Sequence, residues 1–181
     1  MELTDRVIIE DNGMNVELKH WCEAYTFQLR EAADCPEIEE NLRDGFPVPY
    51  TLSDAEDYID SCIRMEGDKQ LCRAILAGGN VVGSIGLFRC SNVFRYNAEL
   101  GYWLARPYRN QGIMTEAIRQ MCGIGFSTWD IVRIFAEPFG YNQASVRALE
   151  KAGFIWEGTL KKGVFKRGSF VDYHIYALLR Q

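Results

Sequence analysis

A polar turn between a strand-like segment and a helix-like segment constrains the fold of this chain more than any other feature of its sequence. Residues 98–105, AELGYWLA, are typical of a strand, and residues 116–126, EAIRQMCGIGF, are typical of a helix. The stretch RPYRNQGIMTEA (106–117) joins them, with two arginines and a single glycine, Gly112. A strand that passes directly into a helix favours a sheet covered by helices, with a parallel step near this junction.

The other segments also alternate between strand-like and helix-like patterns. Leu71–Cys90 reads as two strands around a Gly78-Gly79-Asn80 turn, which is the strongest hairpin signal in the chain. Ser53 and Glu56 form a capping-box pattern that predicts a helix from Asp54 to Met65. Further strands are predicted at 6–10, 97–105, 131–138, 154–158 and 170–179, and further helices at 16–30, before the glycine and prolines of 41–50, around 114–126 and at 142–153. The expected fold class is α/β or α+β.

Length and composition indicate one domain, residues 1–181. With 48% hydrophobic residues the chain can bury one sizeable core, and no linker or internal repeat divides it. A net charge of −5 argues against nucleic acid as a partner, because binding phosphates takes a concentrated basic surface. No apolar run approaches the ~20 residues of a membrane span, and the start of the chain does not resemble a signal peptide. We therefore expect a cytoplasmic protein without a membrane partner.

The six cysteines and two histidines do not indicate a disulfide framework or a metal site. The cysteines are irregularly spaced, and no C-x-x-C pair occurs. We expect free, mostly buried thiols and no metal, although His20 and Cys22 are close in sequence. The cysteines are Cys22, Cys35, Cys62, Cys72, Cys90 and Cys122.

A short basic cluster flanks the polar hairpin that is expected between 154–158 and 170–179. A solvated sheet edge is the expected role for such charges, and a phosphate contact is the alternative. The cluster consists of Lys161, Lys162, Lys166 and Arg167.

The polar junction has the properties of an anion site. The first turn of a helix leaves about four N–H groups without intrahelical partners, at the positive end of the helix dipole. Such an end binds anions, and phosphate above all. Gly112 allows the backbone to curl so that successive amides point inward, and Arg109 adds positive charge. Alternatively, Gly112 only eases the turn and the arginines are solvated. No Walker string occurs, and Gly123-Ile-Gly125 lies in a helix pattern, where it favours packing.

Four strings, in order along the chain, resemble one protein family. RNQGIM (109–114) is similar to the acetyl-CoA pyrophosphate loop, R/Q-x-x-G-x-G/A, of the GNAT superfamily of acyl-CoA-dependent N-acyltransferases. RVIIE, NLRDGFPVPYTLSDAEDYI, AELGYWLARPYRNQGIMTEA and NQASVRALEKAGFIWEGTLKKGVFKRGSFVDYHIYALL together resemble its RimJ/RimL-like branch, named for N-terminal acetyltransferases of ribosomal proteins. The resemblance extends from Arg6 over nearly the whole chain.

The resemblance implies the GNAT fold, a mixed, mostly antiparallel sheet that splays open where acyl-CoA binds, with helices on both faces. By position, Trp103 and Leu104 would offer main-chain hydrogen bonds to the pantetheine. Asn142 would contact the cofactor, or would simply cap its helix. Met114 stands where the family usually has Gly or Ala, which would narrow the loop. The residues that would hold the pyrophosphate are Arg109, Asn110, Gln111, Gly112, Ile113, Met114 and Thr115.

The resemblance also implies catalytic residues. Glu99 is the first candidate for the base and Glu137 the second, although Glu99 could instead be a structural carboxylate. Many GNAT enzymes protonate the thiolate with a tyrosine seven positions beyond the residue that matches Asn142, but Leu149 occupies this position. The RimJ/RimL-like branch offers Ser145 as a hydrogen-bond donor or relay, unless Ser145 only caps its helix.

The implied reaction is direct acetyl transfer from acetyl-CoA to a primary amine, preferably a protein or peptide N-terminus, without a metal. Phe46 and Tyr50 would contact this acceptor, unless they are packing residues. Where some relatives carry an acid in the last hairpin, this chain has Val164 and Phe165. The alternatives are a small acceptor (polyamine, amino sugar or amino acid) and a non-catalytic acyl-CoA-binding module. A homodimer is the candidate assembly.

Overall fold

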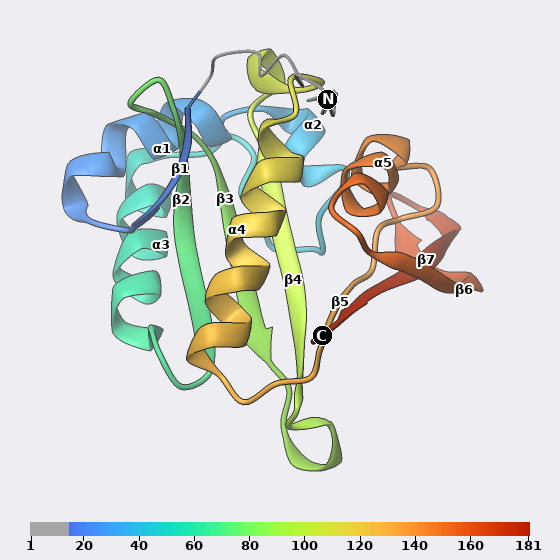
Figure 1. Cartoon of the computed structure of the whole chain (residues 1–181). Helices are drawn as coiled ribbons and strands as arrows, with labels where there is room; N and C mark the ends of the chain where they lie inside the picture. The colour runs from blue at the N-terminus through green and yellow to red at the C-terminus, as the bar shows by residue number, and fades with distance from the viewer. Residues whose placement is uncertain (1–14) are drawn as a thin grey trace, which may run out of the picture.

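One seven-stranded sheet organises the computed structural model, which describes residues 15–181 (Figure 1). The strand order is β1-β2-β3-β4-β5-β7-β6, and among these neighbours only β4 and β5 are parallel. The strand predicted at 6–10 lies outside the described residues. The strands are β1 (Val16–His20), β2 (Gln70–Ala77), β3 (Asn80–Arg89), β4 (Asn97–Leu104), β5 (Arg133–Ala136), β6 (Ile155–Lys166) and β7 (Ser169–Leu179). The helices are α1 (Thr26–Ala33), α2 (Pro36–Glu39), α3 (Leu52–Met65), α4 (Ile113–Thr128) and α5 (Gln143–Lys151), and short 3-10 turns occur at Glu23–Tyr25, Asn92–Phe94 and Arg106–Tyr108.

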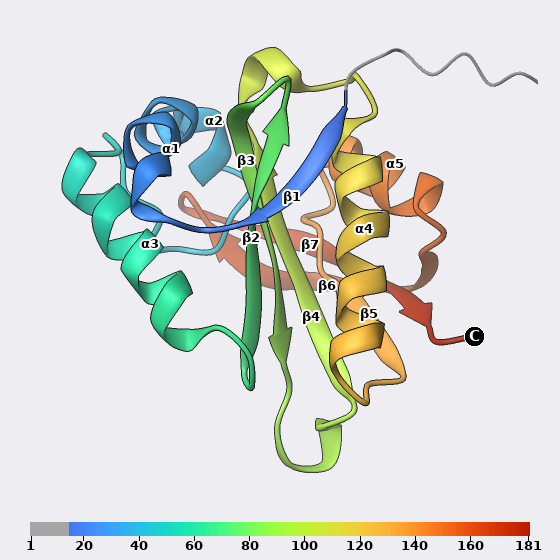
Figure 2. The ribbon, with the colours of Figure 1, turned by 60° about the vertical axis from the view of Figure 1, so that its left-hand side comes forward.

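The helices cover both faces of the sheet. Figure 2 shows α1, α2 and α3 on one side of the strands, and α4 and α5 on the other. Each face has its own buried core, with Leu29 and Ile59 in the first and Ile118 in the second. Helix α4 approaches the sheet closely at Gly125, where a Cβ atom would lie 2.3 Å from Cδ1 of Leu87. This glycine is therefore a packing residue, as the sequence predicts.

The prediction of a helix at 16–30 is wrong for its first part, because Val16–His20 form strand β1. Val16 and Leu18 are half-buried and pack against the core of the α4 face, whereas Glu17 and Lys19 form an ion pair with each other. Every residue of β1 pairs with β2. Over so few residues a period of two is hard to distinguish from a helical period, and the available edge of β2 decides in favour of the strand.

Helix α3 begins two residues before the predicted start. The hydroxyl of Thr51 accepts a hydrogen bond from the amide of Asp54 at 3.2 Å, and the Asp54 carboxylate accepts one from the Thr51 amide at 2.8 Å. This pair is the capping box of the helix. Ser53 and Glu56 fit the same pattern in the sequence, but both lie inside the helix.

The sheet opens between β4 and β5. The two strands pair only over Asn97–Glu99 and Arg133–Phe135. Strand β5 ends at Ala136, two residues before Pro138, which has no N–H group to continue a ladder. Strand β4 continues to Leu104 with β3 as its only partner among the described residues. Beyond position 99, the edge of β4 that faces away from β3 is therefore unpaired.

Strands β6 and β7 form a longer hairpin than the sequence predicts. Strand β6 continues through Lys161 and Lys162 to Lys166, with an irregularity in the pairing between Leu160 and Val164. The turn follows at Arg167-Gly168, where φ is 49° and 77°. The turn therefore lies at the C-terminal end of the basic cluster, and Lys161 and Lys162 belong to the strand.

Candidate active site

The opening in the sheet borders a large cavity. Its volume is about 1390 Å³, and it is lined from both faces of the sheet. The loop between α2 and α3 contributes to one side, and the first turns of α4 and α5 contribute to the other. Of the predicted site residues, Gln111 alone does not line it, because its side chain turns back to the carbonyl of Pro107 at 2.8 Å.

The start of α4 presents a run of unpartnered amides at this cavity. Within residues 15–181, the amides of residues 110–115 donate no hydrogen bond, and the first helical bond runs from the amide of Glu116 to Gly112 at 3.1 Å. Gly112 and Asn110 have φ values of 79° and 62°, so the chain curls at both positions. These amides lie at the positive end of the helix dipole, which is a suitable place for a pyrophosphate.

Met114 contributes to both the core and the cavity. Its side chain is half-buried and packs against the core of the α4 face, and it also lines the cavity. The protein interior therefore takes up part of the bulk that this residue adds relative to Gly or Ala, and the Met114 amide stays in the unpartnered run.

Two hydrogen bonds fix which side each residue of β4 faces. The amide of Ala105 donates to the carbonyl of Val82 at 2.8 Å, and the amide of Cys90 donates to the carbonyl of Asn97 at 2.9 Å. Main-chain groups alternate in direction along a strand, so the odd-numbered residues of β4 bond to β3.

The even-numbered residues Tyr102 and Leu104 consequently turn their main-chain groups toward the opening. The main chain of Trp103 is used within the sheet, which differs from the expected pantetheine contact. Arg109 Nε donates to the carbonyl of Leu104 at 3.2 Å, so this side chain also links the loop to the strand edge. Trp103 instead contributes its side chain, whose ring centroid is 6.0 Å from that of Phe46.

Ser145 and Tyr102 form a hydroxyl pair in the cavity. The Ser145 hydroxyl is 2.7 Å from the Tyr102 hydroxyl, while the Asn142 side chain accepts a hydrogen bond from the Ser145 amide at 3.1 Å. Asn142 is therefore the cap of α5, and the Ser145 hydroxyl has another partner. Burial raises the pKa of Tyr102, so the phenol stays protonated. Leu149 is fully buried in the core.

Arg43 joins the two candidate bases. Its Nη2 atom lies 2.5 Å from Glu99 and 3.0 Å from Glu137. Burial raises the pKa of Glu99, Arg43 opposes this rise, and the negative charge of Glu137 adds to it. Sequence reasoning missed Arg43, because its partners are 56 and 94 residues away and no local pattern connects them.

Phe46 and Tyr50 occupy different environments. Tyr50 is 4% exposed in the core of the α1–α3 face, so most of its surface is in packing contacts. The same burial raises the pKa of Tyr50. Phe46 is half-buried, and its ring centroid lies 5.1 Å from that of Tyr50. Both line the cavity, as do Val164 and Phe165 from the last hairpin.

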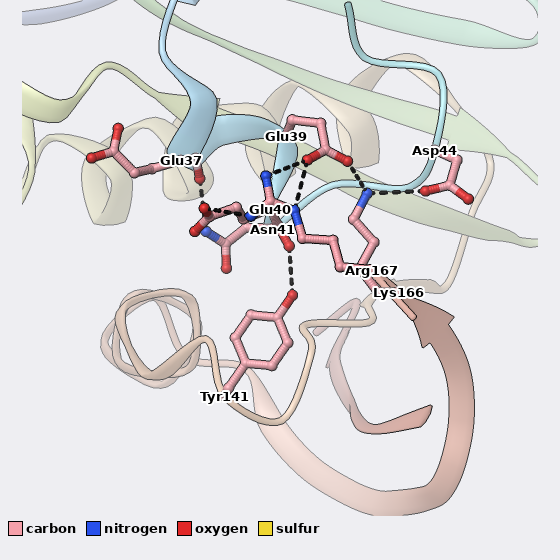
Figure 3. Close-up of polar contacts among 8 residues, drawn as sticks. All are labelled: Glu37, Glu39, Glu40, Asn41, Asp44, Tyr141, Lys166 and Arg167. Atoms are coloured by element: carbon pink, nitrogen blue, oxygen red, sulfur yellow. Dashed lines mark hydrogen bonds and ion pairs between the residues drawn. The ribbon is translucent and has the colours of Figure 1, made fainter. Parts of the chain in front are cut away.

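Ion pairs tie the α2 segment to the turn of the β6–β7 hairpin, and we call this contact the α2–hairpin bridge (Figure 3). The side chain of Lys166 is 4% exposed and pairs with the carboxylates of Glu39 and Asp44. Arg167 pairs with Glu39 at 2.9 Å and with Glu40 at 2.7 Å. The prediction of a solvated edge is therefore wrong for Lys166, whereas the Arg167 side chain is 53% exposed and stays at the surface.

The bridge also includes the segment before α5, because the Tyr141 hydroxyl donates to the carbonyl of Glu40. Lys161 behaves as predicted for a surface charge, since its side chain is 78% exposed beside Asp172. The sequence could not separate these lysines, because the partners of Lys166 lie on a distant segment.

The cysteines are free, as predicted, but only Cys62, Cys72 and Cys122 are buried. Over residues 15–181, no group of three or more His, Cys, Asp or Glu side chains is arranged to hold a metal ion. In the same part of the chain, no helix is long and apolar enough to cross a membrane.

The cavity combines an unpaired strand edge with a run of unpartnered amides at a helix start. Such a site fits a long ligand that carries amide groups and a pyrophosphate, which are the features of an acyl-CoA. Fold and site thus define an acyl-CoA-dependent acyltransferase. The model of the acetyltransferase (GNAT) domain family matches residues 16–155. The chain belongs to the GNAT acetyltransferase family.

Individual relatives agree with this assignment. The chain is 29% identical over 147 residues to the SPbeta prophage-derived uncharacterized N-acetyltransferase YokL of Bacillus subtilis (strain 168), covering 80% of each protein. It is 31% identical over 107 residues to the putative ribosomal N-acetyltransferase YdaF of the same organism, covering 59% of this chain and 58% of YdaF. The solved structure of RimL, a ribosomal L7/L12 alpha-N-protein acetyltransferase in complex with coenzyme A, matches with a TM-score of 0.81 at 20% identity, covering 91% of this chain and 93% of RimL. The predicted family and fold are confirmed.

Proposed function

We propose that this protein is a cytoplasmic N-acetyltransferase that acetylates a primary amine, preferably the N-terminus of a protein or peptide. One observation carries the proposal: at the opening between β4 and β5, a free strand edge, unpartnered residues at the start of α4 (110 and 112–115) and two carboxylates line a single cavity. The co-substrate, acetyl-CoA, supplies an acetyl group activated as a thioester. The name of YdaF supports an acceptor of the ribosomal-protein type.

The residues of the opening would hold acetyl-CoA along its length. The amides of 110–115 and the dipole of α4 would bind the pyrophosphate, with Arg109 adding charge nearby. The main-chain groups of Tyr102 and Leu104 would bind the amides of the pantetheine, as an added strand would. Asn142 caps α5 with its side-chain oxygen, which leaves the side-chain nitrogen for the cofactor.

Proton transfers are assigned to residues on the two sides of the opening. Glu99 accepts the proton that the attacking amine releases, directly or through a water, and Glu137 is the second candidate for this role. Ser145 donates a hydrogen bond to the departing sulfur, and Tyr102 orients the serine by donating to its oxygen. Transfer is direct, within a complex that contains both substrates.

The chemistry of the acceptor supports an N-terminus. An α-amino group with a pKa near ~7.8 is neutral about one time in seven at pH 7, whereas a lysine near ~10.4 is neutral roughly once in 2500. An N-terminus can therefore react with the help of a weak base. Glu99, a carboxylate paired with Arg43, is such a base.

The test is thiol release from acetyl-CoA in the presence of peptides, polyamines, amino sugars and amino acids, together with thermal stabilisation by CoA. We expect release with peptides that have a free α-amine, and none with the same peptides acetylated at the N-terminus. Release with small amines alone would replace the peptide acceptor by a small one. Stabilisation by CoA without release on any amine would indicate a binding module, and neither effect would contradict the proposal.

A further inference from the structure

Arg43 is an exposed cation that forms ion pairs with two carboxylates, and both carboxylates are far less exposed than Arg43. Its side chain is 68% exposed, whereas those of Glu99 and Glu137 are 25% and 27% exposed. A single atom, Nη2, contacts both carboxylates. Ion pairs with so exposed a member contribute little to stability, so another cation can replace Arg43 at small cost.

The sheet fixes the two carboxylates, but it does not fix Arg43. Glu99 lies in β4 and Glu137 directly follows β5, close to where these strands pair. Arg43 lies between α2 and α3, in neither a helix nor a strand. Its side chain can therefore leave the carboxylates without breaking a helix or a ladder, while the carboxylates keep their places.

The carboxylate pair needs a cation. Two carboxylates that share one site repel each other, and without a positive charge between them one of the two tends to take up a proton. Lys166, a buried cation that lines the cavity, is already paired with Glu39 and Asp44. Within residues 15–181, Arg43 is the cation that pairs with both carboxylates, and a cationic ligand can take its place.

An aromatic surface lies next to this pair. Phe88 is the cross-strand neighbour of Glu99, is 43% exposed and lines the cavity. A Cβ atom on Gly86 or on Gly101 would lie 3.3 Å from an atom of its ring, so the ring lies over these two glycines. Such a surface suits the carbon chain of an amine whose nitrogen is charged.

We propose that Arg43 Nη2 marks the position of the acceptor nitrogen, and that the acceptor binds as an ammonium ion that displaces Arg43 from Glu99 and Glu137. Glu99 then accepts one of its protons, so that the nitrogen attacks as a neutral amine. The acceptor class is a primary ammonium on an apolar stem. A carboxylate next to the nitrogen, as in a free amino acid, is disfavoured because it would meet Glu99 and Glu137. The role of this site in turnover rests on the proposed function, whereas the binding step can be measured without turnover.

The experiment is calorimetric titration with butylammonium and with its neutral counterpart 1-butanol at pH 8, where an alkylamine, like a lysine near ~10.4, is protonated. Arg43→Ala removes the competing cation, and we expect butylammonium to bind about three- to tenfold more tightly than to the unaltered protein. Binding of 1-butanol should not change. Arg64→Ala is the matched control, because Arg64 is exposed on α3 and does not line the cavity.

A second substitution makes the test specific to the carboxylate pair. Adding Glu137→Gln to Arg43→Ala should abolish the increase in butylammonium affinity. If Arg43→Ala does not fold, Arg43→Gln takes its place. Equal or weaker butylammonium binding after removal of Arg43 overturns the proposal, even if amines are acetylated. Tighter binding without acetylation of any amine supports the ammonium site and contradicts the proposed function instead.

Discussion

The hydrogen bond between Tyr102 and Ser145 decides what a single serine can do. A serine in the first turn of a helix usually bonds to nearby backbone. Here Asn142 takes the capping role, so the serine hydroxyl is available to Tyr102 at 2.7 Å. A protonated phenol that donates to Ser145 leaves the proton of the serine free for the cavity. The donor role that we propose for Ser145 therefore requires Tyr102 to be the donor of this pair.

Tyr102→Phe should reduce kcat about fivefold, because Ser145 loses the bond that orients it, and one such bond contributes on the order of 1 kcal/mol. The affinity for acetyl-CoA should not change. Steady-state kinetics and a CoA titration measure the two effects. Tyr176→Phe is the control, since it removes a 3.0 Å hydrogen bond to Glu150 away from the cavity. An unchanged kcat in Tyr102→Phe would show that the pair is only structural.

Gly112→Asp should weaken CoA binding at least tenfold. The new carboxylate would repel the pyrophosphate, and a φ of 79° costs a non-glycine residue about 1–2 kcal/mol. Gly79→Asp provides the same charge at a nearly identical φ of 82° in the β2–β3 turn, where it does not line the cavity. Both variants should lose similar stability, but only Gly112→Asp should lose CoA affinity. Equal CoA affinity of the two variants in a binding titration would refute the anion site at α4.

Among the elements, α2 depends most on contacts with distant parts of the chain. It spans only Pro36–Glu39, which is too short to be stable alone. Ile38 is buried on one side, and the α2–hairpin bridge holds the other. The bridge joins α2 to the end of β6, and α2 leads into the loop that carries Arg43. The bridge therefore closes part of the cavity wall.

Lys166→Met should lower the free energy of unfolding by about 2–3 kcal/mol, because it leaves the buried side of the bridge without its cation while keeping a similar volume. Lys161→Met, whose pair is exposed, should cost at most about 1 kcal/mol. Denaturant unfolding of both variants measures the difference.

The contrast should also depend on pH. Hydrogen bonding to Lys166 lowers the pKa of Glu39 below its usual value of 4.5. A group with a lowered pKa contributes stability above its unfolded pKa and loses it as the pH falls through the folded one. The difference in unfolding free energy between Lys166→Met and Lys161→Met should therefore be fully present at pH 7 and shrink below about pH 4. A difference that does not change with pH would argue against the ion pair as its cause.

On the scale of the whole molecule, the cavity exists because the sheet splits into two parts, and helices cover the faces of both parts. Strands β1 to β4 form one part, β5 to β7 form the other, and only a short parallel pairing joins them. Helices on both faces cover these parts (Figure 2). Ser145 and Glu99, to which we assign the proton transfers, both line the cavity at this opening.

Local signals in the sequence were sufficient for much of this architecture. The Gly78-Gly79 turn, the start of α4 at Gly112 and the cap of α5 at Asn142 depend on backbone conformation and on hydrogen bonds within a few residues. The four strings in order identified the family. Such features can be read directly, because the residues that cause them are neighbours in the chain.

The tertiary structure alone decided the features that depend on distant partners. Strand β1 needs the edge of β2, Arg43 needs one carboxylate from β4 and one directly after β5, and Lys166 needs Glu39. No pattern within one segment records these contacts, since folding brings the partners together only when the sheet forms. For the same reason, the sequence by itself determined the cofactor class, whereas the ion pairs of Arg43 with Glu99 and Glu137 became visible only in the fold.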